Sequence, residues 1–155
     1  MSAVERFDVE RVAKIFQDCL HENDDVLLDS YLEAYEEINK FFHLMGSVFG
    51  FVSSDVRSKI DILCEYRRKE STGERFLTIK TMITYEKGEE LLKDHSYVSG
   101  SRTLLRLHRG LGELVLQIIA SRTRKQIVNA GVIELIYIHM YVLLSYGYTK
   151  TKCYL

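Results

Sequence analysis

The chain has 155 residues, of which 46% are hydrophobic and 28% charged, with a formal net charge of −1 and no proline. This composition excludes a disordered chain, a collagen-like sequence and a proline-rich linker, and the length suits one domain with its own core. Because proline breaks helix interiors and is common in turns, its absence indicates a mostly helical protein. Residues 1–100 carry 13 Lys and Arg against 20 Asp and Glu, whereas residues 101–155 carry 8 against 2. This asymmetry indicates either a docking place for an anion or two halves that fold against each other.

The first predicted helix follows Asp8, a plausible N-cap, and ends in the acidic stretch at residues 21–25. A second helical run begins at Tyr31, where Ser30 and Glu33 have the spacing of a capping box. Its apolar stripe continues to about Val52. The last four residues of that run are apolar nearly all round, which predicts that they are covered on both sides.

Ser53 and Ser54 interrupt this run, and a further helix is predicted over residues 55–68. A polar loop at residues 69–74 precedes another apolar stripe from Phe76 to Leu92, which Gly88 interrupts. A turn at residues 95–101 leads into a strong amphipathic helix over residues 102–122. From residue 126 onward the helical pattern is weak, and a helix or a strand could be argued equally.

The sequence lacks the usual motifs for metal binding, nucleotide binding, nucleophilic catalysis and nucleic-acid binding. Cys19, Cys64 and Cys153 match neither a disulfide framework nor a zinc spacing, and there is no nucleotide-binding loop or nucleophile elbow. The basic run at residues 122–125 has no interleaved aromatic residues of the kind found in nucleic-acid patches. We therefore expect no metal, no cofactor, no nucleic-acid partner and no catalytic residues.

Neither end of the sequence carries a membrane or export signal of the usual kind. The first residues have no apolar signal core, and the most apolar run, residues 132–146, is shorter than the roughly 20 residues of a membrane span. The odd number of scattered cysteines is typical of a reducing compartment. These features favour a cytoplasmic protein.

Asp55 and Lys59 form an i, i+4 carboxylate–ammonium pair, which is usually a surface salt bridge. On a helical wheel, however, Lys59, Ile62, Leu63 and Tyr66 all lie within about 80° of Asp55. The charged pair therefore heads an apolar stripe. Two interpretations remain open: a partly buried structural ion pair, or the polar end of a site for an amphiphile.

Arg102, Arg106 and Arg109 are spaced i, i+4, i+7 and form one stripe on the predicted helix, opposite a leucine face. The stripe is either a solvated surface or an anion site. Arginine forks bind phosphate oxygens with two parallel hydrogen bonds, and two forks one turn apart can enclose a phosphomonoester.

Two long blocks, DVLLDSYLEAYEEINKFFHLMGSVFGFVSSDVRSKIDIL and SGSRTLLRLHRGL, resemble the glycolipid transfer protein superfamily and most closely its ceramide-1-phosphate transfer branch. The similarity covers roughly residues 7–119. It implies an all-α, two-layer helical sandwich that takes the chains of a sphingolipid between its layers. It also implies non-vesicular lipid transfer in the cytosol with transient, peripheral membrane contact, and no enzyme activity.

Matched position by position, the resemblance assigns four residues to the lipid headgroup. Asp55 would accept hydrogen bonds from the ceramide amide and hydroxyl, and Lys59, Arg102 and Arg106 would surround the phosphate. Arg106 stands where the glycolipid-binding branch has a tryptophan that stacks on the sugar, and this chain has no tryptophan. The resemblance therefore favours ceramide-1-phosphate over a glycolipid.

Family members continue with helices that carry a histidine-proline-tryptophan segment, and nothing after residue 125 matches it. His139 lacks the neighbouring proline and tryptophan, so no role is carried to it. We expect a transfer-protein portion at residues 1–120, a divergent tail at residues 121–155, and an incomplete sandwich. Two alternatives stay open: a helical protein-interaction module that binds no lipid, and an inactive truncated isoform.

Overall fold

The computed structural model describes residues 7–22 and 25–120, with the side chains of all of these except Val9, Val48 and residues 113–120. The expectations for residues 121–155, including the helix-or-strand question and the divergent tail, lie outside the described residues. The described chain is helical, as its sequence predicts. Its α-helices are α1 (Val9–Asp18), α2 (Leu28–Leu44), α3 (Gly50–Arg68), α4 (Ile79–Gly88) and α5 (Gly100–Ala120). The shorter elements are the 3-10 helices η2 (Ser47–Phe49), η3 (Gly73–Phe76) and η4 (Leu91–Lys93) and the paired strands β1 (Leu20–His21) and β2 (Asp25–Val26).

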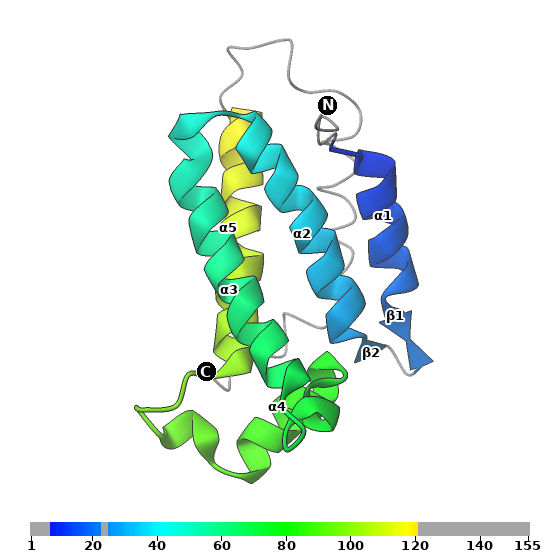
Figure 1. Ribbon diagram of the computed structural model, residues 1–155, viewed down its shortest axis with the longest axis vertical. Coiled ribbons are helices and arrows are strands. Elements are labelled where there is room, and N and C mark those ends of the chain that lie inside the picture. Colours follow the sequence, from blue (N-terminus) through cyan, green and yellow to red (C-terminus); the bar gives the residue numbers. More distant parts are fainter. Residues whose placement is uncertain (1–6, 23–24, 121–155) are drawn as a thin grey trace.

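Helices α1, α2 and α3 lie side by side, and α5 packs behind α3 (Figure 1). Helix α4 lies at the lower end of this view, against the beginning of α5. The apolar faces of all five helices meet in one core, whose largest fully buried apolar side chains include Tyr35, Phe42, Phe76 and Met82. No helix within residues 7–22 and 25–120 is long and apolar enough to cross a membrane.

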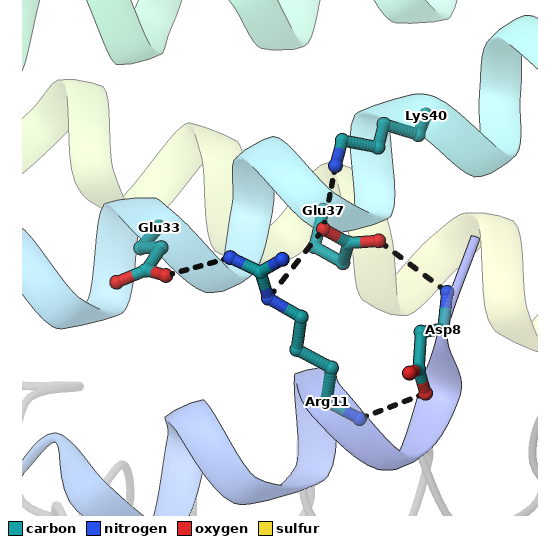
Figure 2. Close-up of polar contacts among 5 residues, drawn as sticks. All are labelled: Asp8, Arg11, Glu33, Glu37 and Lys40. Atoms are coloured by element: carbon teal, nitrogen blue, oxygen red, sulfur yellow. Dashed lines mark hydrogen bonds and ion pairs between the residues drawn. The ribbon is translucent and has the colours of Figure 1, made fainter. Parts of the chain in front are cut away.

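The start of α1 follows the prediction, because the Asp8 carboxylate accepts a hydrogen bond from the backbone N–H of Arg11 at 3.0 Å. A buried carboxylate then fixes α1 to α2 (Figure 2). Glu37 of α2 accepts hydrogen bonds from the Asp8 backbone N–H and from Lys40, and Arg11 lies between Glu37 and Glu33. Charges of both signs, on Arg11, Glu33, Glu37 and Lys40, therefore interact at the edge of the α1–α2 contact.

The beginning of α2 and its junction with α3 differ from the sequence-based prediction. Helix α2 begins at Leu28 without a side-chain cap, so the capping box at Ser30 and Glu33 is wrong. The break between the two helices lies at Gly46, whose φ of 87° ends a right-handed helix and is readily adopted only by glycine.

The expected break at Ser53 and Ser54 is wrong for a related reason. Ser53 lies inside α3, buried, with its hydroxyl oxygen 2.9 Å from Nε2 of His43 on α2. This hydrogen bond between helices supplies the partner that a buried hydroxyl needs. The expectation that residues 49–52 are covered on both sides is also wrong, since Phe51 is 75% exposed.

The start of α5 is fixed by Glu86, a fully buried carboxylate on α4. Glu86 accepts hydrogen bonds from the backbone N–H groups of Gly100 and Ser101, at 2.6 and 3.1 Å, and from the hydroxyls of Ser99 and Tyr97. Four donors compensate the desolvation of the carboxylate, and its negative charge lies at the positive end of the α5 dipole. Burial and the charge of Glu86 together raise the pKa of Tyr97, so its hydroxyl remains a donor.

Replacing this carboxylate should destabilise the fold. We expect Glu86→Gln to lower the free energy of unfolding by about 1–3 kcal/mol, because the neutral amide turns a donor toward groups that themselves donate. Glu89→Gln, at an exposed position just after α4, is the matched control and should change it by less than about 0.5 kcal/mol. Urea titration measures both, and equal effects would contradict a structural role for Glu86.

Candidate functional site

The four residues predicted to bind a headgroup come from two packed helices. Asp55 and Lys59 lie in the first half of α3, and Arg102 and Arg106 lie in the first two turns of α5. The two helices contact each other along their length, so residues far apart in the sequence share one surface.

Helices α3 and α5 run antiparallel, and two contacts fix which residues are level. Near the end of α3, the Tyr66 hydroxyl donates to the carbonyl oxygen of Val98, just before α5, at 2.8 Å. Nearer its beginning, Asp55 of α3 and Arg106 of α5 line the same cavity. Of the four predicted residues, Asp55 and Arg106 line the same cavity, and Lys59 is joined to Asp55 by a hydrogen bond. Arg102 lies one turn before Arg106 on α5, outside the cavity lining.

The Asp55–Lys59 pair is formed as predicted, with the ammonium donating to Oδ1 of the carboxylate. The Lys59 side chain is only 17% exposed, whereas that of Asp55 is 67% exposed. The stripe that begins with them continues into buried Leu63 and half-buried Tyr66. The pair therefore spans the boundary between solvent and the apolar interior.

The arginines of α5 lie on its exposed face, and Leu104, Leu107 and Leu111 are buried on the opposite face, which confirms the predicted amphipathic pattern. Arg102 donates a hydrogen bond to the carbonyl oxygen of Leu92 at 3.0 Å. Arg106 forms no hydrogen bond or ion pair within the described part of the chain. Neither guanidinium is thus neutralised by a carboxylate there.

An apolar cavity of about 220 Å³ lies between α2, α3 and α5. Among the residues that the structure describes, its charged lining residues are Asp55 and Arg106. The remaining lining residues are Tyr35, Phe42, Phe51, Val52, Val56, Leu107, Gly110 and Leu111. Typical small-molecule sites have roughly 300–1,000 Å³, so the space is small for a whole ligand with long chains.

The charges around the cavity favour an anion. Lys59 and Asp55 are paired with each other, whereas Arg106 at the cavity and Arg102 one turn before it are not paired with a carboxylate of the described residues. Guanidinium groups bind phosphate and carboxylate oxygens with paired hydrogen bonds. The exposed Asp55 carboxylate, in turn, can accept hydrogen bonds from amide and hydroxyl donors. The site can therefore hold a molecule that combines an anionic group, neutral donors and an apolar part.

The sequence pattern does not identify the residues that form the wall of this cavity. Tyr35, Phe42, Leu107 and Leu111 were recognisable as apolar stripe positions, but the stripe alone does not distinguish a cavity wall from a filled core. Val56 and Gly110 carried no signal.

A polar network lies behind the wall. The Tyr31 hydroxyl oxygen is 2.7 Å from Nδ1 of His108 and 3.4 Å from the hydroxyl of Tyr35. Burial raises the pKa of both tyrosines, so their hydroxyls stay protonated. In the described residues no cluster of three or more His, Cys, Asp or Glu could hold a metal ion.

The sequence profile of the family "Glycolipid transfer protein (GLTP)" matches residues 26–134. The chain is 40% identical over 121 residues to a ceramide-1-phosphate transfer protein of Danio rerio. This alignment covers 76% of this chain and 57% of the relative. It is 35% identical over 121 residues to the ceramide-1-phosphate transfer protein of Homo sapiens, with 76% and 56% covered. The chain thus spans little more than half the length of these relatives.

The fold is also similar to solved structures of ceramide-1-phosphate transfer proteins. The human ceramide-1-phosphate transfer protein in complex with 2:0 ceramide-1-phosphate superposes with a TM-score of 0.67 at 26% identity, over 91% of this chain and 76% of that chain. The mouse ceramide-1-phosphate transfer protein without ligand gives a TM-score of 0.66 at 26% identity, over 90% and 80%.

The exposure of Asp55 predicts that its pairing with Lys59 contributes little to stability. We expect Asp55→Ala to lower the free energy of unfolding by less than about 1 kcal/mol, because the carboxylate is exposed and a single hydrogen bond joins the pair. Asp29→Ala is the matched comparison, because Asp29 is similarly exposed at 60% but accepts two hydrogen bonds, at 2.8 and 2.6 Å, from Arg67. It should cost about 1–3 kcal/mol. A loss at Asp55 as large as that at Asp29, in urea titrations, would favour the structural-pair interpretation.

Proposed function

Because this chain belongs to the glycolipid transfer protein family, we propose that it binds ceramide-1-phosphate and carries it between membranes without chemical change. The curated relatives named above are ceramide-1-phosphate transfer proteins, and one solved neighbour holds that lipid. The proposal includes no enzyme activity, a cytosolic location and transient, peripheral contact with membranes.

The observation that carries the proposal is the composition of the cavity between α2, α3 and α5. Its described lining is apolar except for one carboxylate and one guanidinium, those of Asp55 and Arg106. Exposing a lipid chain to water costs about 0.8 kcal/mol per methylene, so a carrier must enclose the chains while it holds the headgroup. An apolar cavity with these two charged residues has the chemical character that both requirements call for.

In the proposed complex, Lys59, Arg102 and Arg106 hold the phosphate. A phosphomonoester carries roughly −1.5 to −2 charges near neutral pH, which suits a region with an excess of positive charge. Arg106 is well suited to this role because no carboxylate in the described part of the chain competes for its guanidinium.

Asp55 provides the second element of selectivity. A ceramide has an amide N–H and a hydroxyl that can donate to a carboxylate, whereas the esters of a diacyl glycerolipid cannot donate. The chain has no tryptophan, which removes the stacking partner expected of a glycolipid site. The site should therefore prefer a ceramide over a glycerolipid and a phosphate over a sugar.

A two-chain lipid needs more space than the cavity of about 220 Å³ provides. The proposal therefore requires that α2, α3 and α5 separate on binding, or that the chains extend to the part of the protein outside the described residues. Phe51 lines the cavity while it is 75% exposed, and Leu44 at the end of α2 is 56% exposed. This apolar end of the α2–α3 pair suits contact with a membrane during uptake. The predicted boundary at residue 120, between a transfer-protein portion and a divergent tail, remains a prediction.

A transfer assay between vesicles tests the proposed function. Ceramide-1-phosphate, a glycosylceramide and phosphatidic acid are offered in parallel to the full chain, with circular dichroism to show that it is folded. We expect transfer of ceramide-1-phosphate well above that of the other two lipids. Equal inactivity toward all three, with folded protein, would contradict lipid transfer and favour an interaction module.

Arg106→Leu should abolish ceramide-1-phosphate uptake while it leaves the melting temperature nearly unchanged, because the guanidinium lies on the surface without a described partner. Arg57→Leu is the matched control. It removes an exposed arginine of α3 that pairs with Glu36 and Asp61, and it should leave uptake unchanged. Loss of uptake together with a fall of the melting temperature by many degrees would show that Arg106 is structural.

A further inference from the structure

Gly110, in the middle of α5, is a glycine that neither its backbone nor the packing of the described residues requires. Its φ is not positive, and a Cβ atom there would lie within 4 Å of nothing in the described residues beyond its own stretch of helix. At Gly100, by contrast, a Cβ atom would lie 2.5 Å from a ring carbon of Phe76. Glycine destabilises a helix interior relative to alanine, because it loses more conformational freedom on folding. A glycine at position 110 therefore needs another reason.

Gly110 lines the cavity between α2, α3 and α5 at the place where the cavity reaches the surface. The buried lining residues form its inner wall: Tyr35, Phe42, Val56, Leu107 and Leu111. The exposed lining residues are Phe51 and Asp55 on α3 and Arg106 and Gly110 on α5. The cavity therefore opens between α3 and α5.

The opening has a polar and an apolar part. On each helix a charged lining residue and an uncharged one are four positions apart, and are therefore neighbours on one face: Asp55 with Phe51, and Arg106 with Gly110. Because the two helices run in opposite directions (Figure 1), Phe51, before Asp55, and Gly110, after Arg106, lie toward the same end of the opening. This arrangement matches an amphiphile whose anionic group and hydrocarbon chain lie side by side.

The position of Gly110 around α5 shows where a side chain would point. At about 100° per residue, the lining residues of α5 follow one another at about 0° for Arg106, 40° for Gly110, 100° for Leu107 and 140° for Leu111. Gly110 thus lies inside the arc that faces the cavity and not at its edge. A side chain at position 110 would point into the cavity, beside Arg106.

The free space is of the size of a hydrocarbon segment. The cavity has a volume of about 220 Å³, and an engineered apolar cavity of about 150 Å³ in another protein accepts benzene. A side chain as large as leucine would take up a substantial part of such a space. The glycine therefore leaves room that a ligand can use, at a cost in helix stability.

We propose that Gly110 determines which lipids this site accepts, because its missing side chain leaves the space in which a hydrocarbon chain passes from the headgroup into the cavity. The anionic group lies at Arg106, and the first methylene groups of one chain pass Gly110. The inference rests on the proposed function and adds the residue that limits the size of the chain site.

The test measures binding of two single-chain phosphomonoesters, butyl phosphate and decyl phosphate, to the full chain. We expect decyl phosphate to bind at least about tenfold more tightly, because its six further methylene groups leave water. In Gly110→Leu the two should bind within about threefold of each other, since the leucine occupies the space of the longer chain. Gly110→Ala should give an intermediate ratio. Ceramide-1-phosphate is measured alongside, and Gly110→Leu should weaken its binding at least about tenfold.

The melting temperature separates this role from a structural one. Gly110→Ala should raise it by about 2–4 °C, because alanine replaces glycine in a helix interior, and Gly110→Leu should not lower it. Gly88→Leu is the matched control. Gly88 ends α4 outside the cavity lining, and a Cβ atom there also meets nothing within 4 Å. This control should keep the ratio of the two alkyl phosphates.

Three results would overturn the inference: equal binding of the two alkyl phosphates by an original chain that binds ceramide-1-phosphate, an unchanged ratio in Gly110→Leu, or loss of binding together with a lower melting temperature. Each would leave the proposed function intact, because the original chain still binds ceramide-1-phosphate. Failure of the folded original chain to bind ceramide-1-phosphate would instead refute the proposed function, and this inference with it.

Discussion

The buried carboxylate of Glu86 holds the first turn of α5, and the candidate site depends on that contact. Its hydrogen bonds to Gly100 and Ser101 fix where α5 begins and how it is rotated. Since the helix is rigid, Arg102 and Arg106 then lie on the exposed face and the leucines lie in the core. A carboxylate that already occupies the positive end of the helix dipole also prevents an external anion from binding there. The side chains of Arg102 and Arg106, in the first two turns, remain available for it.

Five arginines in the described part of the chain are used in two different ways. Arg11, Arg57 and Arg67 each pair with a carboxylate and connect neighbouring helices or turns. Within the described residues, Arg102 contacts only a neutral carbonyl oxygen, and Arg106 has no such partner. Apart from the Asp55–Lys59 pair, the described residues therefore leave the positive charge near the cavity without a carboxylate partner. The guanidinium groups of Arg102 and Arg106 are therefore available to bind an anionic headgroup. The apolar cavity beside them suits the hydrocarbon chains of a lipid.

The sequence predicts local features of this structure well and tertiary ones poorly. The Asp8 cap, the amphipathic α5 and the Asp55–Lys59 pair depend on residues three or four positions apart, and all three are present. Periodicity does not predict the break at Gly46, because the apolar stripe continues past it and a positive φ leaves no trace in periodicity. The pattern places a break at Ser53 because the partner of its hydroxyl, His43, lies on another helix. The role of Glu86 depends on neighbours across the fold, although a carboxylate inside an apolar stripe is a signal that the sequence offers.

The most direct test of this account is a crystal structure of the chain with a short-chain ceramide-1-phosphate. We expect the phosphate between Lys59, Arg102 and Arg106, the ceramide amide and hydroxyl on Asp55, and the chains between α2, α3 and α5. A lipid bound elsewhere on the surface, or a phosphate in solvent without contact to the three basic residues, would contradict it.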